Sequence, residues 1–375
     1  MRLTEQLAAL PAPLLERLRA RGFESARLLR WAETVGKDRD ARNRIRGDVQ
    51  PPTPGDFVDA PAEGSAEHAR LREAGLAALV RGEVAFCVLA GGMATRMGGV
   101  VKALVEVLPG KTFLDLRLAE NEHLARVAGA RIPLWLMTSE ATNRPIREAL
   151  GARLQAGDRC ATFEQHVSLR LTPEGELFLE DGEPSVYATG HGDLPDALRE
   201  SGLLGRFIAG GGKTVLFTNL DNLGATIDPA ILGWHLAHGG PLTSELVDKV
   251  SGDRGGGPVR WDGRLVVVEE FRLPPDFDPS SVPVFNTNTF LASAAALEGL
   301  SMEWTYVEVE KKIGDRKAIQ FERLVNELTV GLPTRFLRVP RDGLVARFLP
   351  VKDVQELELR RPQIEAIARA RGMLG

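Results

Sequence analysis

Apolar and polar residues follow two spacing patterns along this chain, and the two patterns alternate from about Glu67 onward. Short, mostly apolar runs of β character are separated by stretches in which apolar residues recur at helical spacing. The β-rich runs are Val84–Ala90, Ile132–Met137 and Thr214–Thr218, and the helical stretches are 67–81, 113–127 and 143–152. Strands that alternate with helices indicate a parallel sheet covered by helices. The pattern predicts an α/β fold.

Two segments depart from this alternation and predict antiparallel hairpins. Residues Val167–Phe178 would turn at Pro173-Glu174-Gly175, and Val259–Val268 would turn at Asp262-Gly263. Asp-Gly between two apolar runs is a strong hairpin signal. We therefore expect a Rossmann-like mixed, mostly parallel sheet flanked by helices.

The two ends of the chain differ from this central part. Residues 1–36 carry leucine and alanine at helical spacing, interrupted by Pro11 and Pro13, and 48–66 are rich in proline, glycine and acidic residues. These features predict a small helical N-terminal region and a connecting strap on the surface. The C-terminal part predicts a helical stretch whose arginines face solvent: Arg360, Arg361, Arg369 and Arg371.

Composition narrows the possible partners. The 375 residues can bury a large core, and the formal net charge of −4 comes with no basic block long enough for a nucleic-acid track. Cys87 and Cys160 are too few for a disulfide framework or a zinc cluster, and the N-terminal residues lack the apolar region of a signal peptide. No apolar run approaches the ~20 residues of a membrane span. We expect a cytoplasmic protein with small-molecule ligands, with neither nucleic acid nor membrane as partner.

The segment Val84–Lys102, VAFCVLAGGMATRMGGVVK, carries the clearest chemical signal. An apolar run ends in a glycine-rich turn, where glycines 91, 92, 98 and 99 allow positive φ and a close approach of the main chain to a ligand. Arg96 and Lys102 add the positive charge that phosphoryl oxygens need. The segment predicts a nucleotide-binding turn.

Two common nucleotide motifs do not fit this turn. A Walker motif needs lysine and a hydroxyl residue directly after its last glycine, and Val100-Val101 stand there instead. A dinucleotide fingerprint needs G-x-G-x-x-G, but Gly91 and Gly92 are adjacent and Arg96 stands where the last glycine would be. A P-loop NTPase and a standard NAD site are both disfavoured.

Polar clusters follow several apolar runs, at the sheet edge where ligands bind in α/β folds. Thr138-Ser139 follow LWLM, Thr218–Asn222 follow TVLF, and Phe285–Thr289 follow VPV. Asparagine side chains suit sugar hydroxyls. Asp221 could cap a helix, but beside a phosphate-binding turn its carboxylate would suit Mg²⁺.

Two further segments are weaker signals. His191 is flanked by glycines, so we expect it outside the core, in a site or a surface turn; Gln165 in FEQ could be a simple exposed residue before a strand. Cys87, Trp135 and Trp234 read as core residues.

Taken in order, these clusters resemble the UTP-glucose-1-phosphate uridylyltransferase family, the eukaryotic-type UDP-glucose pyrophosphorylases. The UDP-N-acetylhexosamine and UDP-sugar pyrophosphorylases are more distantly similar. The resemblance runs from about Glu83 to Leu359 through LAGGMATRMG with Lys102, FEQ, GHGD, TNLDNLGATID, FNTNTFL and RFLPVK. It implies a nucleotide-diphospho-sugar transferase fold of the GT-A-like kind, UTP and glucose 1-phosphate as substrates, and Mg²⁺ as cofactor.

The resemblance also assigns roles to matching positions. The nucleotide would lie on Ala90, Gly91, Gly92, Gln165 and Gly190. The sugar phosphate would lie on His191, Asn219, Glu269, Asn286 and Asn288, the metal on Asp221, and the charge of the transferred group on Arg96, Lys102 and Lys352. The chain would divide into an N-terminal helical region with its strap (1–82), a nucleotidyltransferase catalytic domain (83–330) and a short C-terminal segment carrying Lys352 (331–375).

The chain departs from the family pattern at a few positions. Val101 and Thr189 stand where the family has proline, and Thr289 ends the FNTNN motif, which bears on the choice of sugar. A UDP-N-acetylglucosamine or broad UDP-sugar pyrophosphorylase is therefore an alternative, and a non-catalytic UDP-sugar-binding regulator is a second. The family's β-helical C-terminal domain is not expected here, and the oligomeric state stays open.

Overall fold

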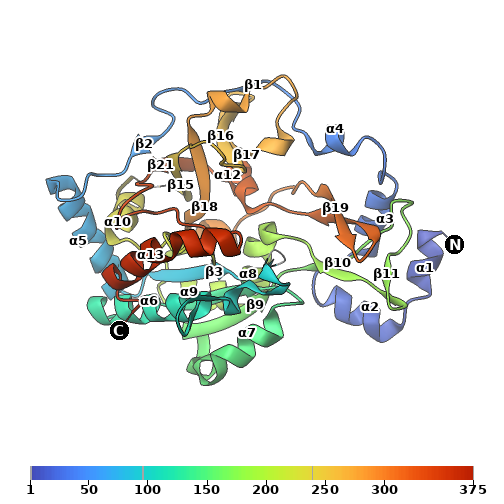
Figure 1. Ribbon diagram of the computed structural model, residues 1–375, viewed down its shortest axis with the longest axis horizontal. Helices are drawn as coiled ribbons and strands as arrows, with labels where there is room; N and C mark the ends of the chain where they lie inside the picture. Colours follow the sequence, from blue (N-terminus) through green and yellow to red (C-terminus); the bar gives the residue numbers. More distant parts are fainter. Residues whose placement is uncertain (1, 95–96, 239, 375) are drawn as a thin grey trace.

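The computed structural model describes residues 2–94, 97–238 and 240–374, and its centre is a mixed sheet (Figure 1). Within the described part of the chain this sheet has eight strands. Their order is β2 (Val58–Asp59), β21 (Thr334–Arg338), β15 (Leu242–Asp248), β18 (Val284–Ser293), β14 (Thr214–Asn219), β3 (Val84–Leu89), β8 (Leu134–Thr138) and β9 (Cys160–Glu164).

The direction of the strands confirms the predicted mixed, mostly parallel sheet. Strands β14, β3, β8 and β9 are mutually parallel, as are β15, β21 and β2, while β18 runs antiparallel to both β14 and β15. Every residue of β3 is buried, which is typical of a central strand covered on both faces.

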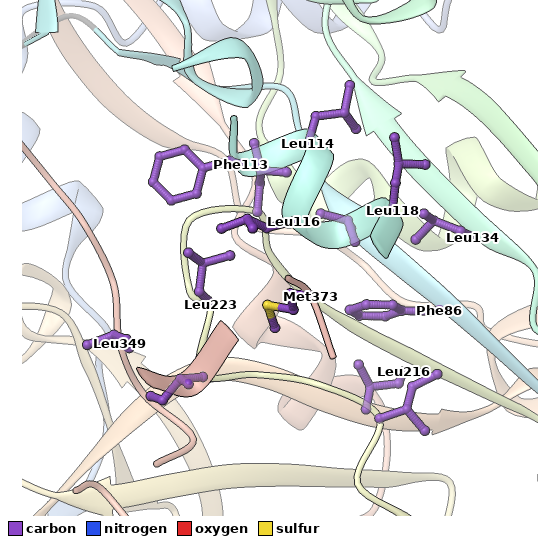
Figure 2. Close-up of a cluster of buried hydrophobic side chains, with 14 of the residues drawn as sticks. Phe86, Phe113, Leu114, Leu116, Leu118, Leu134, Leu216, Leu223, Leu349 and Met373 are labelled. Carbon is purple, nitrogen blue, oxygen red and sulfur yellow. The ribbon is translucent and has the colours of Figure 1, made fainter. Parts of the chain in front are cut away.

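Helices cover the two faces of the sheet with separate cores. Phe86 and Leu216 contribute to one core, while Cys87 and Phe217 point into the other with Trp135. The first core also receives the C-terminal segment, and Figure 2 shows Met373 beside Phe86 and Leu116. The helices are α5 (Ala66–Val80), α6 (Phe113–Ala128), α10 (Pro229–His238) and α13 (Val354–Ala370) with the first core, and α8 (Leu194–Glu200), α9 (Leu203–Ala209) and α11 (Ala294–Glu298) with the second; α7 (Asn143–Leu150) adds Ile146 to the first.

Local signals explain where these helices begin and end. Thr112 caps α6 in a capping box with Asp115, and Gly129 ends the helix with φ 61°. Helices α5 and α10 pack closely because Gly75 and Gly233 have no side chain: an added Cβ would overlap the backbone of the other helix. The predicted core residues Cys87, Trp135 and Trp234 are confirmed as buried.

The N-terminal helices form a third core at the end of the molecule away from α5 (Figure 1). They pack on β10 and β20 and confirm the predicted interruption near the prolines, because Pro11 precedes the second helix. The elements are α1 (Leu3–Ala8), α2 (Ala12–Arg19), α3 (Ser25–Ala32), α4 (Arg39–Asn43), β10 (Val167–Leu169), β13 (Val186–Ala188), β19 (Val307–Ile313) and β20 (Arg316–Glu322).

One predicted hairpin is confirmed and the other is partly wrong. Strands β16 (Gly256–Trp261) and β17 (Arg264–Glu269) meet at Asp262 and Gly263, whose φ values of 47° and 78° fit a two-residue hairpin turn. The other segment turns as predicted, with a bridge between Leu171 and Leu177, but β10 pairs with β13. Pairing across the turn at 173–175 is limited to one bridge, because β10 forms its remaining hydrogen bonds with β13.

The predicted strap, residues 48–66, contributes a short strand to each of two sheets. Strand β1 (Val49–Gln50) pairs with β16, and β2 pairs with β21. The predicted division at 82 and 330 stays a prediction, although strands from all three segments share the central sheet. The remaining short elements are β4 (Met93–Ala94), β5 (Val100–Val101), β6 (Glu106–Leu108), β7 (Lys111–Thr112), β11 (Leu179–Glu180), β12 (Glu183–Pro184) and α12 (Leu328–Gly331).

The prediction that all four C-terminal arginines face solvent is wrong for Arg371. Its guanidinium donates to the carbonyls of Gly224 at 2.6 Å and Ala346 at 2.7 Å, so it joins the end of α13 to two loops. No helix in the described ranges combines the length and the apolarity needed to cross a bilayer.

Candidate active site at the carboxyl edge of the sheet

The glycine-rich turn folds into a very small hairpin after β3. Strand β4 pairs with β5, and the Lys102 amide donates to the Gly92 carbonyl at 3.2 Å. This return places Lys102 beside the start of the turn. Gly98 and Gly99 have the expected positive φ (89° and 72°), whereas Gly91 and Gly92 do not. Arg96 lies outside the described residues.

Four of the five predicted nucleotide residues lie at the ends of β3 and β9, and the fifth, Gly190, lies in another loop. Ala90 is buried and its amide donates to the Met137 carbonyl at 2.8 Å, while the Gln165 amide donates to the Thr138 carbonyl at 2.9 Å. A Cβ on Gly91 would overlap Oε1 of Gln165, so glycine is required for this side chain to lie against the turn. A Cβ on Gly92 would meet nothing within 4 Å, so this residue borders open space.

Lys102 and Asp221 form the charged centre of the site. Nζ of Lys102 lies 2.6 Å from Oδ2 of Asp221, and their side chains are only 20% and 17% exposed. Low exposure strengthens this pair relative to a surface ion pair. The turn after β3 and the turn after β14 are therefore in direct contact through opposite charges.

The turn that carries Asp221 is held by a residue that sequence reasoning missed. The fully buried side chain of Arg117, on α6, donates to the carbonyls of Ala225 at 2.5 Å and Asn222, and pairs with Glu120 at 2.9 Å. Its signal in the sequence was weak: an arginine among the apolar positions 113–118.

Two asparagines meet beside this turn. Nδ2 of Asn288 donates to Oδ1 of Asn219 at 3.0 Å. Asn288 has φ 57° and lies where β18 bulges opposite β15. Backbone strain of this kind costs about 1–3 kcal/mol and is often found at functional sites. Oδ1 of Asn286 accepts the Asn288 amide at 3.3 Å, which supports the bulge.

The prediction that Phe285–Thr289 follow a strand is wrong, because they lie inside β18. They still reach the predicted edge, since β18 is antiparallel to β14 and its first half extends beyond Phe217. Thr289 is fully buried and its hydroxyl lies 2.9 Å from that of Thr218. It therefore faces the interior.

The loop carrying Gly190 and His191 packs against the end of β20. A Cβ on Gly190, where φ is 104°, would lie 2.5 Å from the Arg323 carbonyl oxygen. Nδ1 of His191 accepts the Val325 amide at 2.9 Å, and burial lowers the pKa of its imidazole. His191 is therefore neutral near pH 7 and carries its proton on Nε2.

Buried charges fix this loop. Asp193 is fully buried; its Oδ1 accepts from Nε of Arg323 at 2.7 Å and its Oδ2 from Thr189 Oγ1 at 2.8 Å. Thr189 thus forms a hydrogen bond within the loop. Arg323 was not foreseen, because its partner Asp193 is far away in the sequence.

Glu269 is the last residue of β17. Its Oε1 accepts from Nδ2 of Asn326 at 3.0 Å. Burial raises the pKa of Glu269 to about 7, and Arg272 opposes this rise. None of its hydrogen bonds in the described ranges joins it to another predicted site residue.

Lys352 is exposed and, in the part of the chain that the structure describes, its side chain forms no ion pair or hydrogen bond. The segment before it is anchored to the Asp221 turn, since Asn222 accepts the Leu349 amide at 2.7 Å and donates to the Arg347 carbonyl at 3.1 Å. Arg347 is itself buried against Glu245, with Nε 2.9 Å from Oε2. These hydrogen bonds hold residues 347–349 beside the Asp221 turn, but none of them involves the side chain of Lys352.

The donor set suits one kind of metal site. Among the described residues no three His, Cys, Asp or Glu side chains gather around one point. Among the described residues, the carboxylate of Asp221 contacts Lys102 at the glycine-rich turn. Mg²⁺ is commonly held by one or two carboxylates plus substrate phosphates and water, so the residues fit Mg²⁺ that arrives with a nucleotide.

Comparison with known proteins decides the family. Residues 37–366 match the family model described as UTP-glucose-1-phosphate uridylyltransferase. The chain belongs to this family. A UTP-glucose-1-phosphate uridylyltransferase of Saccharomyces cerevisiae is 31% identical over 294 residues, covering 74% of this chain and 59% of the relative. A protein of Hordeum vulgare with the same name is 30% identical over 293 residues, 72% of this chain and 60% of its own length. The chain thus spans about three fifths of these relatives.

Solved structures confirm the fold. A UDP-glucose phosphorylase from Trypanosoma brucei matches with a TM-score of 0.75 and 22% identity, covering 92% of this chain and 77% of that one. A Leishmania major UDP-glucose pyrophosphorylase variant in complex with UDP-glucose matches with a TM-score of 0.73, 22% identity and the same coverages.

Proposed function

We propose that the protein transfers the uridylyl group of UTP to glucose 1-phosphate, forming UDP-glucose and pyrophosphate. The observation that carries this proposal is the contact between Lys102 and Asp221, which joins a nucleotide-type turn to a turn rich in asparagine. Family membership supports the same reaction.

The nucleotide half would bind the uridine. The carboxamide of Gln165 can both donate and accept, which suits the edge of a uracil ring. Its placement against Gly91, beside the open space at Gly92, would leave room for a base and its ribose. Ala90 and Gly190 would contribute backbone to the same half.

The sugar-phosphate half would bind glucose 1-phosphate. Asn219 and Asn288 present amide groups to sugar hydroxyls, with Asn286 behind them and Glu269 as a further acceptor. Neutral His191 would offer its Nε2 proton to a phosphate oxygen.

The chemistry would be a direct displacement. A phosphate oxygen of glucose 1-phosphate attacks the α-phosphorus of UTP, the bond to the β-phosphate oxygen breaks, and pyrophosphate leaves from the opposite side. Lys102, Lys352 and Arg96 would neutralise charge that develops on the α-phosphate and the leaving group. Asp221 would hold Mg²⁺, which neutralises phosphate charge when bound. The side chains would position both substrates, so no covalent intermediate with the protein is needed.

Pyrophosphate release tests the proposal. Purified protein with UTP and Mg²⁺ should release pyrophosphate with glucose 1-phosphate, faster than with galactose 1-phosphate or N-acetylglucosamine 1-phosphate. A preference for another sugar would retain the reaction and change the substrate. A folded protein that binds UDP-glucose but releases no pyrophosphate would contradict the transfer. We also propose a cytoplasmic location, which the two free cysteines, Cys87 and Cys160, support.

A further inference from the structure

The connection between α2 and α3 lies directly against the segment that carries Gln165. The Val167 amide donates to the Arg21 carbonyl at 2.9 Å. A Cβ on Gly22, where φ is 76°, would lie 2.5 Å from Cγ of His166. The N-terminal helical region therefore touches the residues on the C-terminal side of Gln165.

The side chain of Arg21 binds two carboxylates at this point. Its guanidinium forms ion pairs with Glu140 and Glu164, and its own side chain is 20% exposed. Glu140 follows β8, and Glu164 is the last residue of β9. One cation from the N-terminal region thus joins the ends of two neighbouring strands.

Both carboxylates belong to segments that hold the nucleotide half. Glu164 directly precedes Gln165, and its Oε1 accepts from Nδ2 of Asn143 at 2.7 Å. Ser139, which precedes Glu140, donates its hydroxyl to the Gly91 carbonyl at 2.9 Å. Arg21 is therefore connected to Gln165 through Glu164, and to Gly91 through Glu140 and Ser139.

Packing alone does not fix this region. A surface hollow of about 320 Å³ lies beside it, lined by residues that include Arg21, Asn143, Glu164 and Gln165. Few apolar side chains line this hollow, so the ion pairs of Arg21 act on Glu140 and Glu164 in addition to the backbone hydrogen bonds between β8 and β9. Without Arg21, the carboxylate of Glu164, 32% exposed, and that of Glu140, 50% exposed, would repel each other without a cation between them.

We propose that Arg21 is a positioning residue for uridine recognition, so that the N-terminal helical region is a structural part of the nucleotide site. The inference rests on the proposed function, because it concerns how Gln165, the residue proposed to bind the uracil ring, is held in place. Its effect should be confined to the nucleotide half.

Uridine-nucleotide binding is the test, measured by calorimetry with UMP and UTP and by KM for each substrate. We expect Arg21→Ala to weaken UMP binding and raise the KM for UTP about tenfold, with the KM for glucose 1-phosphate unchanged. Arg21→Lys should retain part of the binding. Arg147→Ala is the matched control, because Arg147 lines the same hollow but bonds Thr162 Oγ1 at 3.0 Å; it should bind like wild type.

A double variant separates positioning from general damage. In the Arg21→Ala background, Glu164→Gln removes the repulsion and keeps an acceptor for Asn143, so it should restore most of the UMP affinity. Unchanged UMP binding by folded Arg21→Ala, equal loss for both substrates, or no rescue would overturn the inference. Wild-type protein that binds no uridine nucleotide would instead contradict the proposed function.

Discussion

The proposed nucleotide half of the site, around Gly91 and Gln165, lies at the ends of parallel strands, whereas the proposed sugar-phosphate half, around His191 and Asn288, depends on segments far apart in the chain. Backbone hydrogen bonds between neighbouring strands set the first half. The second half needs a strained bulge and buried charges such as Arg323 with Asp193. Substitutions should therefore affect the two halves in different ways.

The strongest expected effect comes from the turn between the two halves. Arg117→Ala leaves Glu120 and several carbonyl groups buried without their partner, so the free energy of unfolding should fall by about 3–5 kcal/mol. Urea unfolding measures it. Arg126→Ala is the control, because Arg126 is exposed in the last turn of the same helix. Equal stability of both variants would show that the turn does not need Arg117.

Removing the charge at the contact between the halves should come next. Lys102→Ala should lower kcat roughly 10²–10³-fold, as expected for loss of a cation that stabilises the transition state. Exposed Lys111, replaced by alanine, should leave kcat unchanged and serves as the control. A Lys102→Ala variant that changes only the KM values would restrict this lysine to substrate binding.

Glu269 should make the stability of the folded protein depend on pH. Its folded pKa of about 7 is above its ordinary value of 4.5, so folded protein binds this proton more tightly than unfolded protein. Tighter proton binding by Glu269 adds to the free energy of unfolding. This contribution is complete below the ordinary pKa of 4.5 and is lost as pH rises to about 7.

The measurement is unfolding of wild type and Glu269→Gln from about pH 5 to about pH 8. Relative to the variant, wild type should lose up to about 3 kcal/mol over this range. Parallel curves for the two proteins would refute the raised pKa.

The smallest expected effect concerns the strained bulge. Asn288→Gly accepts the positive φ more readily, so stability should stay within about 1 kcal/mol of wild type. Loss of the hydrogen bond to Asn219 should raise the KM for glucose 1-phosphate about three- to tenfold and spare the KM for UTP. A change in both KM values would show that the halves are not separable.

Local patterns in the sequence were enough to predict β3, β8, β14 and the hairpin at Asp262. They also placed Lys102 and Asp221 in polar turns after apolar strands, and the two side chains form an ion pair there. The supporting charges could not be predicted in this way. Three of these charges are Arg117, Arg323 and Arg347. Each binds a group about a hundred residues away or more, and a contact of this kind leaves no periodic pattern in the sequence.

The pairing of β10 with β13 and the loop contacts of Arg371 were mispredicted for a related reason. In both cases a partner distant in the sequence outweighs the local preference. Asn286 and Asn288 reached the predicted edge by an antiparallel strand, which the apolar run before them did not reveal.

The most direct test of the account follows the α-phosphate itself. Protein is mixed with UTP labelled in the α-phosphate, glucose 1-phosphate and Mg²⁺, then quenched within one turnover, and the label on protein and on nucleotide sugar is counted. Direct transfer predicts that label enters UDP-glucose at the rate of pyrophosphate release, with none on the protein. Label bound to protein, or UTP consumed without labelled UDP-glucose, would contradict the account.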